Sequence, residues 1–274
     1  MSTYVTRLKT LVTQISPEIV PPVAGPQHRP RVPTQAFSEF LINRELGDWA
    51  EDVVRRGVND CGLGLVALPY GRTENLVAGE PGFPEFFLSY HEELRVFGKR
   101  PDLLIYETGQ APTIDLAAKT AAAASKALAG LEVRSSQQSL SGSRTPADLS
   151  FTPKIEEIHN VMRWIELHAV PHFYVQVLFG AVYAIAFERI LELLVAGPKA
   201  SGYTIDREPR NQFKSTVYIP LDKGIRLSLE SGFQEPDLNA FQKRLSSGRM
   251  LFGVRFSGGR VVFDGTKFAE LLKL

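Results

Sequence analysis

The amino-acid sequence predicts an α/β protein in which helices flank a mixed central β-sheet. Two observations lead to this fold class. Between residues 35 and 196, stretches with helical spacing of apolar residues alternate with apolar runs of strand length. The chain has 274 residues, 44% hydrophobic and 22% charged, which is typical of a globular protein with a sizeable core.

The helical segments are recognised by apolar positions three and four residues apart. The clearest follows Pro153, which suits a first helical turn, and carries a stripe of Ile155, Ile158, Met162 and Ile165. The complete set of predicted helices is residues 1–15, 35–57, 115–128, 153–168, 188–196, 237–245 and 267–274.

Short apolar runs between these helices predict strands. They are residues 86–90, 94–97, 103–106, 131–133, 173–179 and 182–187, with further short strands and turns over 203–264. Residues 135–150 are rich in serine, which predicts a mobile loop after the strand at 131–133.

Six prolines occur among residues 16–34, which predicts an extended connector between the first helix and the rest. We therefore divide the chain into an N-terminal helix with a proline-rich arm (1–34) and a single domain (35–274). Within that domain, we expect a catalytic core over about 36–196 and a β-rich part over about 203–274.

Several classes of protein do not fit the sequence. No run of about 18 uncharged apolar residues and no signal-peptide pattern is present. The single cysteine, Cys61, excludes an intramolecular disulfide and a cysteine-based zinc cluster, which fits a cytoplasmic location. The five histidines lack metal-ligand spacing, and His159 and His172 are interpreted as structural residues. The net charge of +1 neither supports nor excludes DNA as a partner.

Two acidic residues at predicted strands indicate phosphodiester chemistry. Asp102 stands at the mouth of one strand and Glu132 lies in the next, 30 residues later. Hydrolysis of a phosphodiester needs an activated water and stabilisation of negative charge, which Mg²⁺ bound by oxygen ligands supplies. We expect Asp102, Glu132 and the backbone carbonyl of Val133 to be the metal ligands.

The pattern of Pro101 and Asp102, followed by Glu132, Val133 and Arg134, resembles the PD-(D/E)xK nuclease signature with arginine in place of lysine. Longer segments between residues 40 and 195 resemble type II restriction endonucleases of the AccI kind. They are NRELGDWAE (43–51), GLEVRSS (130–136), SFTPK (150–154) and VPHFYVQV (170–177).

This resemblance implies a restriction-endonuclease-like PD-(D/E)xK core in a bacterial or archaeal, Mg²⁺-dependent homodimer. Such an enzyme cuts both strands of double-stranded DNA at a short specific sequence, and a cognate DNA methyltransferase is expected in the same system.

The departure from the signature concerns its lysine, which usually contacts the scissile phosphate and the attacking water. Arg134 keeps the positive charge but does not readily give up a proton. We therefore hypothesise that Lys154, at the start of the next predicted helix, shares this role. Glu51, on the helix at 35–57, is a further candidate for the water or metal network.

Two polar regions are candidates for reading DNA bases, although either could be an ordinary surface loop. Glutamine pairs well with adenine and arginine with guanine. The first region contains Ser135, Ser136, Gln137, Gln138 and Arg144. The second contains Arg207, Arg210, Asn211 and Lys214.

Two alternatives to a restriction endonuclease stay open at this point. One is a structure-specific or repair nuclease with the same core. The other is a catalytically dead, sequence-specific DNA-binding protein, which the change from lysine to arginine makes conceivable.

Overall fold

The computed structural model describes residues 3–22, 31–71, 76–112, 121–140, 144–209 and 214–274. Residues 115–120 of the predicted helix at 115–128 lie outside the described residues. In the rest of this segment only α4 (Ala121–Ala124) is helical, and residues 125–128 do not continue the helix. Among the helices in these ranges, none combines the length and the apolar character of a membrane span.

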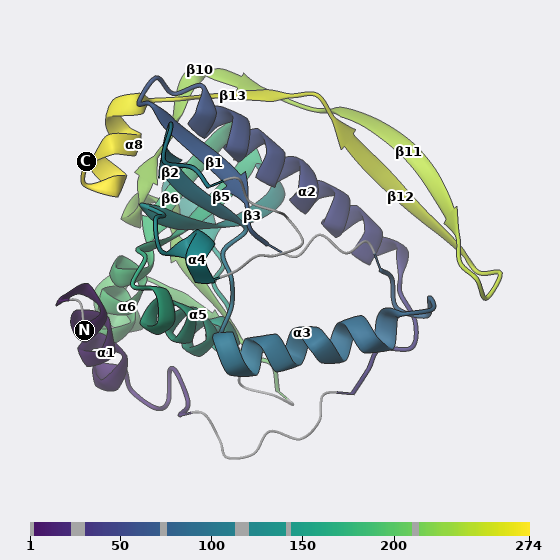
Figure 1. Ribbon diagram of the computed structural model, residues 1–274, viewed down its shortest axis with the longest axis horizontal. Helices are drawn as coiled ribbons and strands as arrows, with labels where there is room; N and C mark the ends of the chain where they lie inside the picture. The colour runs from purple at the N-terminus through teal and green to yellow at the C-terminus, as the bar shows by residue number, and fades with distance from the viewer. Residues whose placement is uncertain (1–2, 23–30, 72–75, 113–120, 141–143, 210–213) are drawn as a thin grey trace.

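A six-stranded mixed sheet forms the centre of the molecule, as the sequence predicts (Figure 1). In spatial order its strands are β1 (Leu65–Pro69), β2 (Leu103–Glu107), β3 (Ala129–Ser139), β5 (His172–Phe179), β6 (Ala181–Ala186) and β9 (Ile225–Arg226). Strands β3 and β5 pair in parallel, and the other neighbours pair antiparallel. Strand β3 is longer than predicted, so residues 135–139 belong to the sheet and not to a loop.

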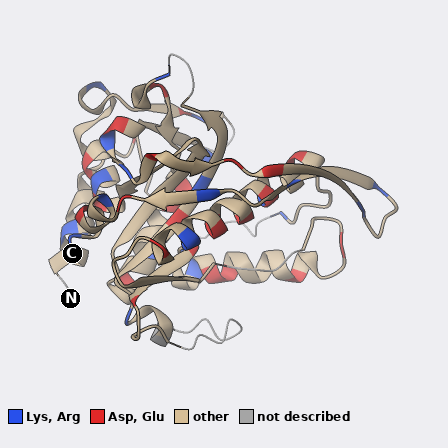
Figure 2. Ribbon diagram, turned by 90° about the horizontal axis from the view of Figure 1, so that it is seen from above, with Lys and Arg blue, Asp and Glu red and all other residues tan. Residues whose placement is uncertain are grey.

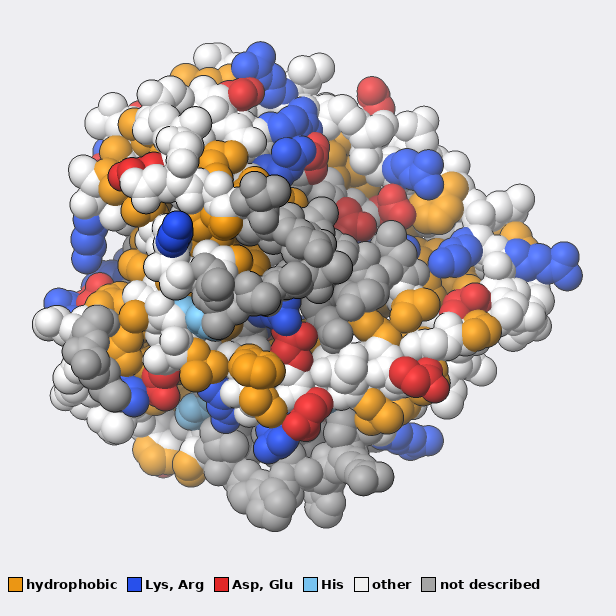
Figure 3. Space-filling view, viewed as in Figure 1, with side chains coloured by type: hydrophobic (Ala, Val, Ile, Leu, Met, Phe, Trp, Pro, Cys, Tyr) orange, Lys and Arg blue, Asp and Glu red, His pale blue; other side chains and the backbone are white. Residues whose placement is uncertain are grey.

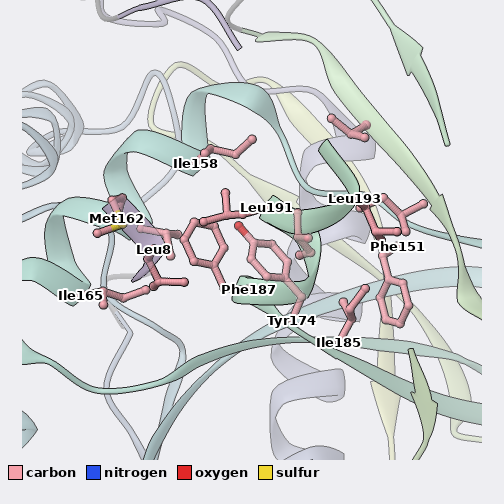
Figure 4. Packing of buried hydrophobic residues seen from close by; sticks show 14 of the residues in the cluster. Leu8, Phe151, Ile158, Met162, Ile165, Tyr174, Ile185, Phe187, Leu191 and Leu193 are labelled. Carbon is pink, nitrogen blue, oxygen red and sulfur yellow. The ribbon is translucent and has the colours of Figure 1, made fainter. Parts of the chain in front are cut away.

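Alternate residues of the strands point to opposite sides of the sheet, and helices cover both of these faces. One face packs against α1 (Thr3–Gln14), α5 (Ile155–His168) and α6 (Phe187–Ala196), and Figure 4 shows Leu8, Met162 and Phe187 in this core. The opposite face packs against α2 (Ser38–Asn59) and α8 (Gly265–Leu272). Leu131 and Val133 of β3 lie on the α2 side.

Helix α1 does not project from the body as an arm. Val5 and Leu8 are buried in the core with α5 and α6. Arg7 forms ion pairs with Glu188 at 2.6 Å and with Glu192 at 2.8 Å. The proline-rich connector therefore joins two parts that pack against the same sheet.

The strands predicted at 86–90 and 94–97 are wrong, because this segment forms one helix, α3 (Phe83–Phe97). Phe83, Phe86 and Phe87 have the helical spacing of three and four residues, and Pro84 suits the first turn. Short apolar runs fit both a strand and a buried helix, so the spacing within them does not identify the element.

The helix predicted at 237–245 is also wrong. This segment is β11 (Asp237–Arg244), which pairs antiparallel with β12 (Met250–Ser257) over its whole length. The hairpin extends along α2 and projects beyond the body (Figures 1 and 2). The intrinsic preference of this segment is overridden by pairing with a partner strand.

The remaining elements complete the C-terminal half. They are η1 (Pro146–Asp148), β4 (Ser150–Phe151), α7 (Pro198–Ser201), β7 (Thr204–Asp206), β8 (Thr216–Pro220), η3 (Leu221–Lys223), β10 (Ser228–Gln234) and β13 (Arg260–Phe263). The predicted β-rich composition after residue 203 is confirmed.

Candidate active site

Three of the predicted site residues lie on one face of the central sheet. Leu131 and Val133 point toward α2, so Glu132 and Arg134 point toward α5. Asp102 directly precedes β2, whose Leu103 also packs on the α2 side. The alternation of strand residues therefore turns the aspartate toward the same face as the glutamate.

Asp102 is held by both its backbone and its side chain. Its N–H donates to the carbonyl of Leu131 at 2.9 Å, and its own carbonyl accepts from the N–H of Tyr70 at 2.7 Å. The carboxylate oxygen Oδ2 accepts from the N–H of Val133 at 2.7 Å. The N–H and C=O of one strand residue point to the same neighbour, so the Val133 carbonyl also lies on the Asp102 side of β3.

Glu132 belongs to a group of four charged side chains, which we call the ion-pair tetrad: Lys99, Glu132, Arg134 and Glu157. Lys99 Nζ lies 2.5 Å from Glu132 Oε1 and 2.9 Å from Glu157 Oε1. The Arg134 guanidinium lies 3.1 Å from Glu132 Oε1 and donates to Glu157 Oε1. Both cations therefore share the same two carboxylate oxygens.

The tetrad is withdrawn from solvent. The exposed fractions of the side chains are 2% for Glu132, 11% for Glu157, 13% for Lys99 and 26% for Arg134. Buried charges are tolerated only when they are paired, so each member depends on the others.

Lys99 and Glu157 were not predicted from the sequence, and tertiary packing positions them. Gly98 ends α3 in the left-handed region, with φ of 78°, and a Cβ there would overlap the carbonyl oxygen of Asn160 on α5. The N–H of Lys99 then donates to that same carbonyl at 2.9 Å. The signal available in the sequence was the position of Glu157, four residues before Val161 and seven before Trp164, which places a carboxylate on an apolar face of the helix.

Burial and neighbouring charges shift the pKa values of this group. Burial, and then repulsion from Glu132, raise the pKa of Asp102 well above its usual range. Burial would raise the pKa of Glu157, but Lys99 and Arg134 outweigh it and hold that pKa well below its usual range. Burial disfavours the charged form of Lys99, yet Glu132 and Glu157 keep its pKa above the ordinary value.

The oxygen atoms around Asp102 fit a divalent cation. Two repelling carboxylates and a carbonyl form a set of hard ligands, and Mg²⁺ often takes only one or two carboxylates from the protein. Oxygen Oε2 of Glu132 is buried and has no hydrogen-bond partner among the described residues. Within the same ranges, no group of three His, Cys, Asp or Glu side chains is arranged for a metal. A metal would therefore rely on Asp102, Glu132 and the Val133 carbonyl.

The other two predicted catalytic residues, Glu51 and Lys154, lie in different surroundings. Glu51 lies close enough to Asp102 for its charge to raise the pKa of that carboxyl group further. Lys154 is exposed before the first turn of α5, and its backbone bridges to Thr216. The ion pairs found for Glu132 go to Lys99 and Arg134, so Lys154 is not the cation next to that carboxylate.

The first predicted base-reading region is divided between β3 and the segment before η1. Ser135, Ser136, Gln137 and Gln138 lie in β3, where both glutamines are exposed, and Arg144 is exposed before η1.

In the second region, Arg207 donates to the carbonyl of Glu18 at 2.6 Å. Lys214 is exposed. Burial lowers the pKa of His91 on α3, and the charge of Lys214 lowers it further. Burial raises the pKa of Glu156 on α5, and the charge of Lys214 opposes this rise. Arg210 and Asn211 lie outside the described residues.

A cavity of about 560 Å³ between α2 and α3 leads to this site, and Lys99 and Asp102 both line it. The projecting β11–β12 hairpin lies beyond α2, and basic side chains gather at its end (Figure 3). Lys243, Arg244 and Arg249 stand near the turn of this hairpin.

A comparison with protein families matches the model described as AccI restriction endonuclease to residues 2–142 and 138–274. Comparisons with curated proteins and with solved structures give no significant match. The matched segments overlap and together span nearly the whole chain. The chain therefore belongs to the AccI restriction endonuclease family, whose members cut DNA.

Proposed function

We propose that this protein is a Mg²⁺-dependent type II restriction endonuclease with a PD-(D/E)xK core, which cuts a short specific sequence in double-stranded DNA. The observation that carries the proposal is the placement of Asp102 directly before β2 and of Glu132 on the neighbouring strand β3. The N–H of Val133, the residue after Glu132, donates to the Asp102 carboxylate. Membership of the AccI family supports the same activity.

Asp102, Glu132 and the Val133 carbonyl would hold the metal, which when bound supplies an activated water and neutralises charge on the phosphate. The hydrogen bond from Val133 N–H fixes one oxygen of Asp102 and leaves the other for a ligand. Arg134 keeps a positive charge beside Glu132, where it can pair with a phosphate oxygen. Glu51 remains a candidate for the water network, and Lys154 for a more distant phosphate contact.

For DNA binding, we propose that Ser135, Ser136, Gln137, Gln138 and Arg144 form one base-reading region, and Arg207, Arg210, Asn211 and Lys214 the other. The exposed side chains of Gln137 and Gln138 lie on the same strand as Glu132, which supports the first region. A strand that carries both catalytic and recognition groups couples the reading of a sequence to the position of the scissile phosphate.

We also propose a homodimer, because a palindromic duplex offers two equivalent phosphates to two copies of one site. A cognate methyltransferase would protect the host DNA from such an enzyme.

Incubation of the protein with plasmid DNA and Mg²⁺ tests the proposal, with Glu132→Ala as the control. Discrete fragments that disappear with the variant are expected. A smear or cutting at junctions would favour a structure-specific nuclease, and binding without cutting would favour a catalytically dead DNA-binding protein.

A further inference from the structure

We propose that Lys99 is the catalytic amine of this site and that Glu157 is the positioning residue that holds Lys99 and Arg134 in place. This inference rests on the proposed phosphodiester hydrolysis. It assigns roles to two residues that lie outside the signature of Asp102, Glu132 and Arg134.

The placement of the Lys99 ammonium supports the first assignment. It contacts Glu132 Oε1 at 2.5 Å and Glu157 Oε1 at 2.9 Å. An ammonium has three N–H donors, and these two contacts among the described residues use two of them. One donor is left for an oxygen of a phosphate that approaches Glu132.

Lys99 and Asp102 border the same cavity. Both residues line the cavity between α2 and α3, whereas Arg134 is not among its described lining residues. A phosphate that reaches the Asp102 carboxylate through this cavity therefore also comes close to Lys99.

The backbone fixes the position of the amine before any substrate binds. Gly98 brings the end of α3 against α5, and the Lys99 N–H is bonded to the carbonyl of Asn160. Pro101 follows two residues later and leads directly into Asp102. A short segment anchored on both sides thus carries the amine and the carboxylate, which preorganises the site.

Hydrolysis explains why a cation is needed at this point. The water oxygen forms a bond to phosphorus while the bond from phosphorus to the leaving sugar oxygen breaks. The water gives a proton to solvent, and the leaving oxygen takes one up. Negative charge grows on the phosphate oxygens in the transition state, and a fixed ammonium stabilises it.

Glu157 acts through the two cations. One oxygen, Oε1, receives both the Lys99 ammonium and the Arg134 guanidinium. The side chain is 11% exposed and lies in the first turn of α5, so it is fixed by a helix. Without Glu157, Lys99 and Arg134 would compete for Glu132 alone, and neither would keep its present position.

The first experiment compares Lys99→Met with a control, Lys199→Met at an exposed lysine of α7, in single-turnover cleavage of plasmid DNA with Mg²⁺. Loss of one group that stabilises transition-state charge typically lowers the rate by about 10²–10³-fold. We expect this loss for Lys99→Met and nearly unchanged cleavage for Lys199→Met. Equal rates for the two variants would overturn the assignment of Lys99.

A rescue experiment guards against a variant that fails to fold. In a Cys61→Ser background that itself cleaves, Lys99→Cys is alkylated with 2-bromoethylamine, which restores an amine of similar length. Recovery of cleavage supports the catalytic role. A soluble, fully alkylated protein that binds DNA in Ca²⁺ without recovering cleavage would refute it.

The second assignment is tested by a double-mutant cycle with Glu157→Gln and Lys99→Met. If Glu157 acts through Lys99, Glu157→Gln lowers the cleavage rate by a clearly smaller factor in the Lys99→Met background than alone. Glu156→Gln is the matched control on the same turn. Equal factors in the two backgrounds would mean that Glu157 does not act through Lys99. If the unaltered protein does not cut DNA at all, the proposed function fails, and if Lys99→Met cuts normally, only this inference fails.

Discussion

The carboxylate of Asp102 accepts a hydrogen bond of 2.7 Å from the backbone N–H of Val133, the residue that follows Glu132. One strand therefore both carries the glutamate and orients the aspartate. A shift of β3 by one residue would turn Glu132 to the opposite face of the sheet. The same shift would move the Val133 N–H away from Asp102. The two acidic residues are thus placed as a unit.

Asp102→Asn should separate activity from stability. Burial and then Glu132 raise the pKa of Asp102, so its charged form is disfavoured in the folded protein. Asparagine keeps an oxygen for the Val133 N–H but cannot ligate a metal as a carboxylate does. We expect cleavage to fall by about 10³-fold or more, with an unchanged or higher Tm. A clear drop in Tm in thermal unfolding would contradict this account.

His172 should make the fold sensitive to acid. It is fully buried in a cluster with Trp164 and Phe187, and burial, followed by the charge of Lys99, lowers its pKa to about 3. Between its ordinary pKa of 6.5 and about 3, the unfolded chain binds a proton that the folded protein does not. The free energy of unfolding should therefore fall with decreasing pH by up to about 1.4 kcal/mol per pH unit.

The measurement is chemical unfolding of the protein and of His172→Phe between pH 7 and pH 4. The contribution of His172 is fully present above pH 6.5 and is lost as the pH falls below it. We expect a shallower dependence on pH in the variant, and identical slopes would refute the prediction.

Gly98→Ala should damage the fold and the site together. The new Cβ would overlap the Asn160 carbonyl, and φ of 78° is unfavourable for alanine. Since Lys99 is bonded to that carbonyl, we expect a lower Tm and slower cleavage. Gly197→Ala is the matched control, because its φ is 85° but no atom lies within 4 Å of the new Cβ. Equal effects on cleavage at the two positions would show that the contact with α5 is unimportant.

Arg144 and Lys214 should differ in the way they contribute to DNA binding. If Arg144 reads a guanine, Arg144→Ala costs about 1–3 kcal/mol at one base pair and relaxes specificity there. If Lys214 contacts a phosphate, Lys214→Ala weakens all sequences alike and lowers the salt slope of binding by about one. Competition binding in Ca²⁺ at several salt concentrations checks both. A uniform loss for Arg144→Ala would remove it from the base-reading group.

The long, strongly patterned elements could be predicted from the sequence. The stripe through Ile155 and Ile165 gives α5, and the apolar runs at 173–179 and 182–187 give β5 and β6. The errors occur where local pattern is ambiguous. Phe86 and Phe87 fit a strand or a helix, and the segment from Asp237 becomes a strand because β12 pairs with it.

The same limit applies to the candidate site. Asp102 and Glu132 were predicted from their places at neighbouring strands, and Arg134 from the resemblance to the nuclease signature, whereas Lys99 and Glu157 were not predicted. Glu157 is 58 residues from Lys99 and 25 from Glu132, and it meets them only because α5 docks on β3. No local spacing encodes that docking, so a single sequence does not reveal it.

The sharing of Glu132 Oε1 by two cations has a thermodynamic consequence. Lys99 and Arg134 balance the charges of Glu132 and Glu157. A divalent ion that binds Glu132 therefore meets a carboxylate whose Oε1 is already paired with two cations. A DNA phosphate that attracts these cations would release that oxygen. Metal and DNA should then bind with positive cooperativity, and each should tighten the other by the same factor. Calcium titrations with and without duplex DNA would measure this factor. Such cooperativity would keep the enzyme largely free of metal until it binds DNA.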